Sequence, residues 1–409
     1  MAKEGVNLTL LPYLHLAFRK CSVSWIPLLT RSADERFYHP ELDVLRFCAF
    51  FLIFIHHSMP HDPAFYTHMG VASWLASALA ALASAGAMGV QLFFLLSSYL
   101  VTELLIRERA LRGGIDLKAF YIRRALRIWP LYLAFLALAW GMQWFVPGQH
   151  IGWRALLAFL FLGGNWWIVF VGFPSSVIFP LWFVSLQEQF YLFWPATMRK
   201  LSARGLLTVA AGLLWAATLV RWYLASRHTC ESKMWCNTFV HLDAIAFGIM
   251  LAVLLGGQAP RLTALHRAAL LIGGLTCFVL AGSYFRIKFD PLTTSRVLLG
   301  YPVAALGAVA LFLGTIHIAG RPTSARSWLS PFIYLGRISY GLYVFHVLGL
   351  MISDYSVQQQ DRSLGRYLFR NAVALAIAVA FAAISYRWLE SPFLNLKQRF
   401  THVLSRPGG

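Results

Sequence analysis

Apolar segments long enough to cross a lipid bilayer recur along this chain of 409 residues. A helix needs about 20 consecutive apolar residues to span the bilayer core, and only helices and closed barrels satisfy their backbone hydrogen bonds there. Hydrophobic residues make up 59% of the sequence and charged residues 12%, whereas a soluble domain carries about 25% charged residues. The sequence therefore predicts an all-α, polytopic transmembrane helical bundle.

We expect about ten spans, together with one or two re-entrant or interfacial helices. The expected spans cover residues 42–60, 88–106, 120–145, 180–198, 205–225, 239–256, 268–285, 296–318, 332–352 and 367–389. Residues 71–86 are Ala-rich and weakly apolar, so we expect a helix that lies against the bundle. Residues 1–36 mix short apolar runs with basic residues, which is typical of an interfacial arm. They lack the pattern of a cleavable signal peptide.

The distribution of basic residues predicts the orientation in the membrane. The cluster between Arg107 and Arg127 should be cytoplasmic, because basic loops stay on that side. Segment 153–171 contains Gly163-Gly164-Asn165 and leaves two topologies open. If it crosses fully, the Arg199–Arg204 loop lies outside; if it is re-entrant, every later basic loop lies inside. We favour the second topology, with both termini cytoplasmic and the protein in a bacterial inner membrane.

The formal net charge of +19 would suggest a nucleic-acid partner in a soluble protein. Here the orientation of basic loops explains most of it, so we expect no nucleic acid. A basic cytoplasmic face also suits anionic membrane lipids or a phosphorylated ligand. Cys230 and Cys236 share one polar loop, and a disulfide and two free thiols both remain open. No metal-ligand spacing occurs, and we expect no metal site.

The first expected span carries ionisable residues, which are expensive in lipid and usually mark function. Arg46 and His57 are eleven residues apart, so they share one helix face at roughly 16 Å separation. His56 is rotated off that face. Asp43 precedes Arg46 by three residues and can pair with it. Anchoring at the headgroups would also explain Asp43 and Arg46, but the short imidazole of His57 cannot snorkel as long basic side chains do.

A second constellation, Arg124 and Arg127, shares one helix face at the expected cytoplasmic boundary. Two guanidinium groups there could hold phosphates through forked hydrogen bonds. Ordinary anchoring of a span end is the alternative, because such clusters are common at these positions.

Two further expected spans carry polar residues, namely Ser185, Gln187 and Glu188 in one and Ser339, Tyr343 and His346 in the other. A carboxylate inside an apolar run needs partners, so Glu188 could pair with an arginine or orient a catalytic group. The second set follows helical spacing and could form a polar stripe, although a single histidine is more often a core residue. The available chemistry is a neutral histidine acting as a general base, assisted by arginine and glutamate.

Six motifs, in this order and over nearly the whole chain, resemble the membrane-bound acyltransferase family 3. They are Arg46 and His57 with ten residues between them, the segment Phe93–Leu100, Arg124 and Arg127 before Pro130 and Tyr132, the segment Trp182–Tyr191, the segment Ile338–His346, and Glu390 before Pro392. Each motif alone is weak, but the ordered set is specific. The chain departs from the family pattern at Gln187, where the family usually has a second glutamate beside Glu188.

The resemblance implies transfer of an acyl group, usually acetyl, from cytoplasmic acyl-CoA to a hydroxyl. The implied acceptor is a sugar of a surface polysaccharide, a lipooligosaccharide or a glycosylated natural product. His57 would be the essential base or acyl relay, with Arg46 and Glu188 beside it, and Arg124 and Arg127 would bind the CoA phosphates. The remaining polar residues would line the substrate pathway: Asp43, Ser185, Gln187, Ser339, Tyr343 and His346. Acyl-CoA is the only co-substrate implied, with no metal.

Two other functional classes remain open. A transporter or flippase could use buried Arg, Glu and His residues as an ion or substrate pathway, and a catalytically inactive, regulatory relative would keep the fold without the chemistry. For the organisation of the chain we expect an interfacial arm at 1–36, a transmembrane acyltransferase domain at 37–396 and a basic cytoplasmic tail at 397–409.

Overall fold

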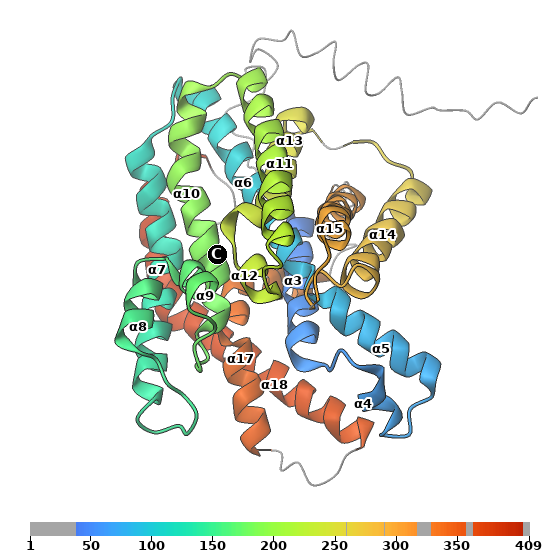
Figure 1. Cartoon of the computed structure of the whole chain (residues 1–409). Helices are drawn as coiled ribbons and strands as arrows, with labels where there is room; N and C mark the ends of the chain where they lie inside the picture. Colours follow the sequence, from blue (N-terminus) through green and yellow to red (C-terminus); the bar gives the residue numbers. More distant parts are fainter. Residues whose placement is uncertain (1–37, 259, 290, 317–328, 357–362, 404–409) are drawn as a thin grey trace, which may run out of the picture.

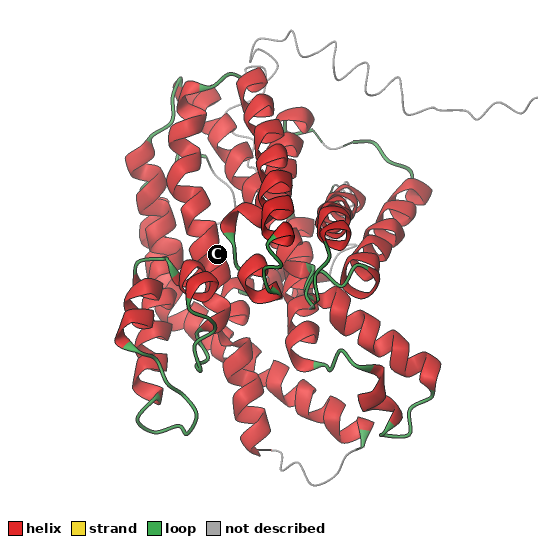
Figure 2. Ribbon diagram, in the orientation of Figure 1, coloured by secondary structure: helices red, strands yellow, loops and turns green. Residues whose placement is uncertain are grey.

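The computed structural model describes residues 38–258, 260–289, 291–316, 329–356 and 363–403. These residues form helices joined by turns and loops, and no β-strand occurs among them (Figures 1 and 2). The prediction of an all-α fold is therefore confirmed. The expected interfacial arm and the last residues of the expected tail lie outside the described residues.

In chain order the helices are α3 (Pro40–Ser58), α4 (Pro63–Thr67), α5 (Ser73–Gly86), α6 (Gly89–Arg112), α7 (Leu117–Met142), α8 (Trp153–Leu160), α9 (Gly164–Phe170), η2 (Phe179–Leu181), α10 (Trp182–Lys200), α11 (Ala203–Ser226), α12 (Glu231–Trp235), η3 (Thr238–His241), α13 (Leu242–Leu255), α14 (Ala264–Val279), η4 (Leu280–Tyr284), α15 (Thr294–Thr315), α16 (Ser330–Arg337), α17 (Ser339–Ser356), α18 (Leu364–Ser385), η6 (Tyr386–Glu390) and α19 (Ser391–Gln398).

Seven helical segments among the described residues are long and apolar enough to cross a membrane. They are Ser73–Arg112, Leu117–Met142, Ala203–Ser226, Thr238–Leu255, Ala264–Tyr284, Thr294–Thr315 and Leu364–Gln398. An eighth arises if α16 and α17, which meet at a bend of 78°, count as one broken span. Charged and amide side chains interrupt the apolar sequences of α3 and α10. The structure thus supports a polytopic helical membrane protein, but it does not confirm the expected count of about ten spans.

Residues 153–171 do not form a spanning helix. They fold into α8 and α9, which have 8 and 7 residues, or roughly 10–12 Å each against a bilayer core of about 30 Å. Leu162 separates them with φ of 58°, a left-handed conformation that ends an α-helix. The side-chain amide of Asn165 then donates to the Cys236 carbonyl at 3.2 Å and to Thr238 Oγ1 at 2.9 Å. This agrees with the topology favoured by the distribution of basic loops, in which segment 153–171 does not cross the membrane completely.

Helix α3 lies among α5, α6, α16 and α17, which pack against it. Glycines allow three of these contacts. A Cβ atom at Gly86 would lie 2.3 Å from the Leu52 carbonyl oxygen, and one at Gly89 would lie 2.4 Å from that of Ala49. A Cβ atom at Gly336 would lie 1.9 Å from the Asp43 carbonyl oxygen. Only glycine permits this backbone approach, so the sequence sets how closely α3 is surrounded.

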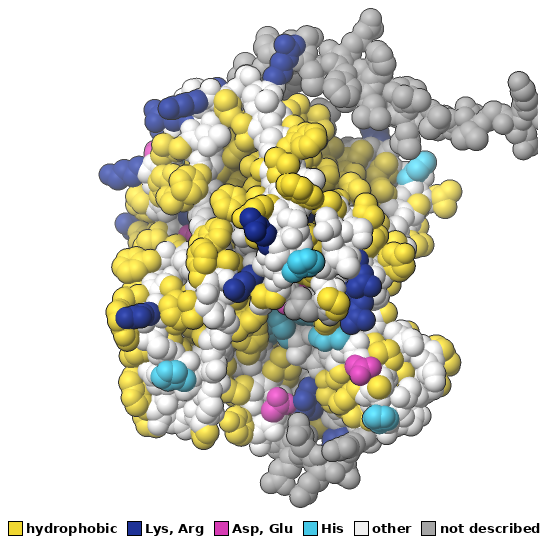
Figure 3. All heavy atoms as spheres, viewed as in Figure 1, with side chains coloured by type: hydrophobic (Ala, Val, Ile, Leu, Met, Phe, Trp, Pro, Cys, Tyr) yellow, Lys and Arg dark blue, Asp and Glu magenta, His cyan; other side chains and the backbone are white. Residues whose placement is uncertain are grey.

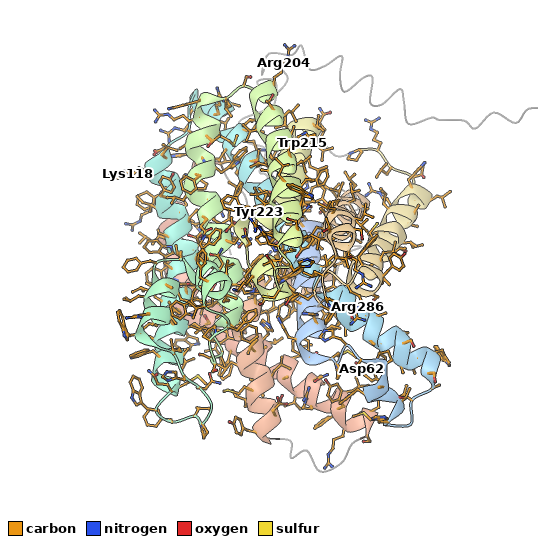
Figure 4. The ribbon with its side chains drawn as sticks, viewed as in Figure 1. Asp62, Lys118, Arg204, Trp215, Tyr223 and Arg286 are labelled. Carbon is orange, nitrogen blue, oxygen red and sulfur yellow. The ribbon has the colours of Figure 1, made fainter. Side chains whose placement is uncertain are left out.

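The outer surface of the bundle is predominantly apolar. Figure 3 shows hydrophobic side chains over most of the visible face, with Lys and Arg along its upper left edge. On α11, Trp215 and Tyr223 are 69% and 52% exposed, and Figure 4 shows them along the helix that begins near Arg204. Lys118 lies toward the same end of the molecule as Arg204, whereas Asp62 and Arg286 lie toward the other (Figure 4). Apolar flanks with charged ends are what a membrane-embedded bundle requires.

Candidate active site

A cavity of about 140 Å³ opens between α3, α6, α7, α10 and α17. The residues from our sequence-based predictions that line it are Asp43, Arg46, Arg124, Arg127, Gln187, Ser339 and Tyr343. They come from four helices, α3, α7, α10 and α17, so the fold assembles one site from motifs that are far apart in the chain. Ser97, Tyr191 and Tyr340 also line the cavity.

Arg46 lies in the wall of this cavity and pairs with the buried Asp43. Its Nη1 donates to Asp43 Oδ1 at 3.0 Å, which confirms the predicted pairing. Asp43 is 2% exposed, and a carboxylate this deeply buried requires such a charged partner. The pair fixes the direction of the Arg46 side chain at the start of α3.

Arg124 and Arg127 line the same cavity from α7, as expected for residues that share a helix face. The guanidinium carbon of Arg124 lies 4.7 Å from the ring centroid of Tyr191 and 5.3 Å from that of Phe120. Arg124 has no hydrogen bond or ion pair to any residue that the structure describes. The negative charge of Glu188 also acts on Arg124. A guanidinium whose N–H donors have no hydrogen-bond acceptor in the described residues is well suited to an anionic ligand.

The polar residues of α10 divide between two faces of the helix. Gln187 lines the cavity and donates a hydrogen bond to Ser97 Oγ. Glu188, one residue later, does not line it; Oε2 accepts a long hydrogen bond of 3.4 Å from Trp129 Nε1. Ser185 is also outside the lining and contacts the Leu181 carbonyl at 3.4 Å. Neither predicted residue therefore touches the cavity, because a rotation of about 100° per residue places them on other faces.

At the other end of α3, His57 meets His346 of α17. His57 Nδ1 lies 2.9 Å from His346 Nε2, and His346 Nδ1 lies 2.6 Å from the Tyr343 carbonyl oxygen. His57 is exposed, while His346 is fully buried. Histidine side chains are visible at the centre of Figure 3, over the last turns of α3. Arg46 lines the cavity, which α17 also borders, and His57 contacts α17 directly.

The hydrogen bonds fix the tautomers of both imidazoles when they are neutral. A carbonyl can only accept, so His346 Nδ1 carries the proton and His346 Nε2 carries a lone pair. His57 Nδ1–H then donates to that lone pair, which leaves His57 Nε2 unprotonated. An unprotonated imidazole nitrogen on a ring that is oriented by its other nitrogen is the arrangement that a general base needs.

His56 is used differently from its neighbour. It is 8% exposed, and its Nδ1 lies 3.0 Å from the Ala83 carbonyl of α5 and 2.9 Å from His61 Nε2. His61 lies in the loop after α3, where burial, followed by the positive charge of Lys288, lowers its pKa. His56 therefore joins α3 to α5 and to this loop.

A layer of aromatic rings separates the cavity from the two histidines. The ring of Tyr343 contacts those of Phe183 and Phe93, with centroid distances of 5.1 and 6.3 Å. Its hydroxyl donates to the Pro180 carbonyl at 2.7 Å, and its ring centroid lies 5.5 Å from that of His346. Neither His57 nor His346 lines the cavity, whereas Tyr343 lines it and also contacts His346.

Arg221, which was not among the predicted site residues, is 1% exposed and forms an ion pair with Asp243 at 2.6 Å. It also donates to the Val240 carbonyl and lies 4.8 Å from the Tyr301 ring. Arg221 could have been recognised from the sequence, because it is the one charged residue in the apolar segment 205–225. Cys230 and Cys236 are both free thiols, so no disulfide joins them.

Comparison with known proteins gives a consistent result. A family model described as an acyltransferase domain matches residues 39–387. "Putative O-acetyltransferase SAS0844" of Staphylococcus aureus (strain MSSA476) is 25% identical over 384 residues, which cover 87% of this chain and 57% of that protein. "Peptidoglycan O-acetyltransferase OatA" of Listeria monocytogenes is 26% identical over 337 residues, covering 76% of this chain and 51% of the relative.

The chain thus spans little more than half the length of these curated relatives. No solved structure matches it significantly. The family model covers most of the chain, including the five segments that form the cavity and the two histidines beyond it. The chain therefore belongs to the acyltransferase domain family, the family that its motifs resemble.

Proposed function

We propose that this protein is an integral membrane O-acyltransferase that moves an acyl group, in particular acetyl, from cytoplasmic acyl-CoA to a hydroxyl of a sugar-containing acceptor. The observation that carries the proposal is the cavity with three arginines in its wall, separated by one aromatic layer from an exposed, oriented histidine. Cationic donors for phosphates and an unprotonated imidazole are the two elements that this reaction needs.

The donor would bind in the cavity. Arg124 and Arg127 would hold CoA phosphates through charge-assisted hydrogen bonds, and Arg46, fixed by Asp43, would hold donor phosphate or orient the reacting end. Gln187, Ser339 and Tyr343 would line the path of the acyl chain from the arginines toward His57. Glu188 lies outside the cavity lining, so it would not touch the donor. It would instead help to position α10, whose Gln187 lines the cavity.

His57 would serve as the base. The acceptor hydroxyl attacks the thioester carbonyl, its proton passes to His57 Nε2, and CoA leaves as the thiol after it takes up that proton. A positioned general base contributes about 10²–10⁴-fold to the rate of such a step. The names of relatives support a carbohydrate acceptor, because two of them are named as peptidoglycan O-acetyltransferases.

We further propose ten spans. Helices α3 and α10 each have 19 residues, which is close to the bilayer requirement of about 20, and the carboxylates of Asp43 in α3 and Glu188 in α10 are buried within the protein. These two helices, the seven apolar segments and the α16–α17 pair make ten. With segment 153–171 incomplete, this arrangement places both termini on the cytoplasmic side of a bacterial inner membrane.

Donor binding provides the test. Purified protein in lipid nanodiscs is titrated with acetyl-CoA, and transfer is followed as release of the CoA thiol when a glycan acceptor is added. Replacing both Arg124 and Arg127 with Gln should weaken donor affinity by at least about tenfold, because each charge-assisted hydrogen bond contributes about 1.5–3 kcal/mol. Arg199→Gln, at an exposed position on α10 outside the cavity lining, is the matched control. A wild-type protein that neither binds nor turns over acetyl-CoA would favour the transporter or the inactive relative.

A further inference from the structure

A second, smaller cavity of about 70 Å³ lies beside the first, between α6, α7 and the C-terminal segment 397–403. Arg124 and Arg127 line both cavities, so the two spaces share a wall of guanidinium groups. The second cavity is half the volume of the first and suits one small group rather than a nucleoside.

The C-terminal segment is attached to this site by specific contacts. Arg123 Nη1 donates to the Phe400 carbonyl at 2.7 Å. His402 contacts Arg112 and lies 3.5 Å from Asp116 Oδ2. Asp116 is in the loop before α7, where the Ala119 N–H, followed by its contact with His402, lowers its pKa. The segment therefore packs against α7 and the loop before it through specific contacts, although its sequence suggested only a basic tail.

The wall of the second cavity is strongly cationic. Arg123, Arg124, Arg127 and Lys397 line it together with one carboxylate, Glu108. Glu108 is neutralised within the protein: Oε2 accepts from Arg123 Nη2 at 2.7 Å, and Oε1 accepts from the Asp116 backbone N–H at 2.9 Å. The side chains that line the cavity therefore have a net positive formal charge of about three, which favours an anion of more than one charge.

Arg124 provides an independent indication of a ligand. It contacts the faces of Phe120 and Tyr191 and is influenced by the charge of Glu188, but within the described part of the chain its N–H groups have no hydrogen-bond acceptor. Partly buried guanidinium groups are normally hydrogen-bonded, so an anion placed between the two cavities would complete the coordination of Arg124.

We propose that the second cavity binds a phosphate monoester of the donor and that the C-terminal segment 397–403 forms the wall that recognises it. This inference rests on the proposed function, because acyl-CoA supplies the phosphate. Coenzyme A carries a monoester at the ribose 3′ position and a diphosphate nearer its thiol. The shared wall of Arg124 and Arg127 would hold the diphosphate, and Lys397 would contact the monoester beyond it.

The test compares coenzyme A with 3′-dephospho-coenzyme A by calorimetry, using the full chain in nanodiscs of zwitterionic lipid. The wild type should bind coenzyme A at least about tenfold more tightly, as expected for loss of one charge-assisted interaction. Lys397→Gln should lose most of this preference by binding coenzyme A more weakly, with its affinity for the dephospho compound unchanged. Lys397→Arg should retain the preference.

Lys118→Gln is the matched control, since Lys118 is exposed at the start of α7 (Figure 4) and lines neither cavity. If Lys397→Gln lowered the affinity for both compounds equally, Lys397 would have a structural role and the inference would be overturned. A wild type that binds both compounds equally would also overturn the inference, although the proposed function would stand. A wild type that binds neither would overturn both.

A third arm identifies the source of the phosphate. If a lipid headgroup occupies the cavity, adding anionic lipid to the nanodiscs should compete with coenzyme A in the wild type and not in Lys397→Gln. That result, combined with no preference for the 3′-phosphate in zwitterionic lipid, would assign the cavity to lipid and overturn the donor assignment.

Discussion

The two adjacent histidines at the end of α3 should differ sharply in function. His57 is exposed and paired with His346, whereas His56 is buried against α5. We expect His57→Ala to reduce acyl transfer by about 10²–10⁴-fold, as for loss of a general base, while donor affinity is retained. His56→Ala should cost far less in rate, and its effect should appear as lower stability. Acetyl transfer in membranes, with protein amounts matched by blot, measures both; near-normal turnover by His57→Ala would refute the assignment.

His346 should act as a positioning residue for His57. Its Nε2 accepts the His57 Nδ1 proton and so keeps the reactive nitrogen unprotonated. Losing that hydrogen bond, about 1–1.5 kcal/mol, should lower the maximal rate by roughly tenfold with KM for the donor unchanged.

The conservative variant His346→Gln tests this role, because its side-chain oxygen can accept in place of Nε2. We expect it to recover much of the rate that His346→Ala loses. Equal activity of the two variants would mean that His346 only fills space in the core.

At the level of helices, the approach of α16 to α3 should control the geometry of the cavity. A Cβ atom at Gly336 would lie 1.9 Å from the Asp43 carbonyl oxygen, so Gly336→Ala forces α16 away from the residue that positions Arg46. Such overpacking costs about 1–3 kcal/mol or more, and we expect a lower melting temperature together with weaker donor binding.

Gly365→Ala is the control for this change, because a Cβ atom there meets nothing within 4 Å in α18. That variant should be neutral or slightly more stable, since alanine favours a helix by about 0.5–1 kcal/mol over glycine. Equal melting temperatures for the two variants would contradict the close contact between α16 and α3.

For the whole molecule, the proposed topology predicts which thiols an impermeant reagent can reach. Cys230 is exposed and Cys236 is buried, in the loop expected outside. In intact cells, an impermeant maleimide should label a protein whose only cysteine is Cys230. A protein whose only cysteine is introduced by Gly114→Cys, between α6 and α7, should react only after the cells are opened. The reverse pattern would invert the orientation and place Arg124 and Arg127 outside.

Much of this protein could be predicted from its sequence, because the relevant rules are local. Apolar length predicted helices that can cross a membrane, and helix periodicity correctly paired Arg46 with Asp43 three residues away. Ionisable side chains have a high free energy in lipid, which explains why such residues inside apolar segments mark a functional site. Seven of the residues singled out from the sequence line the cavity.

Only the tertiary structure decided which distant groups meet. His57 and His346 are 289 residues apart in sequence, and Arg221 rather than a neighbour in α13 pairs with Asp243. Periodicity could not tell whether Gln187 or Glu188 faces the cavity, since both lie in one apolar segment. Each helix fixes its own faces through local geometry, but the order in which helices pack depends on close contacts such as that at Gly336, which arise only when the whole bundle assembles.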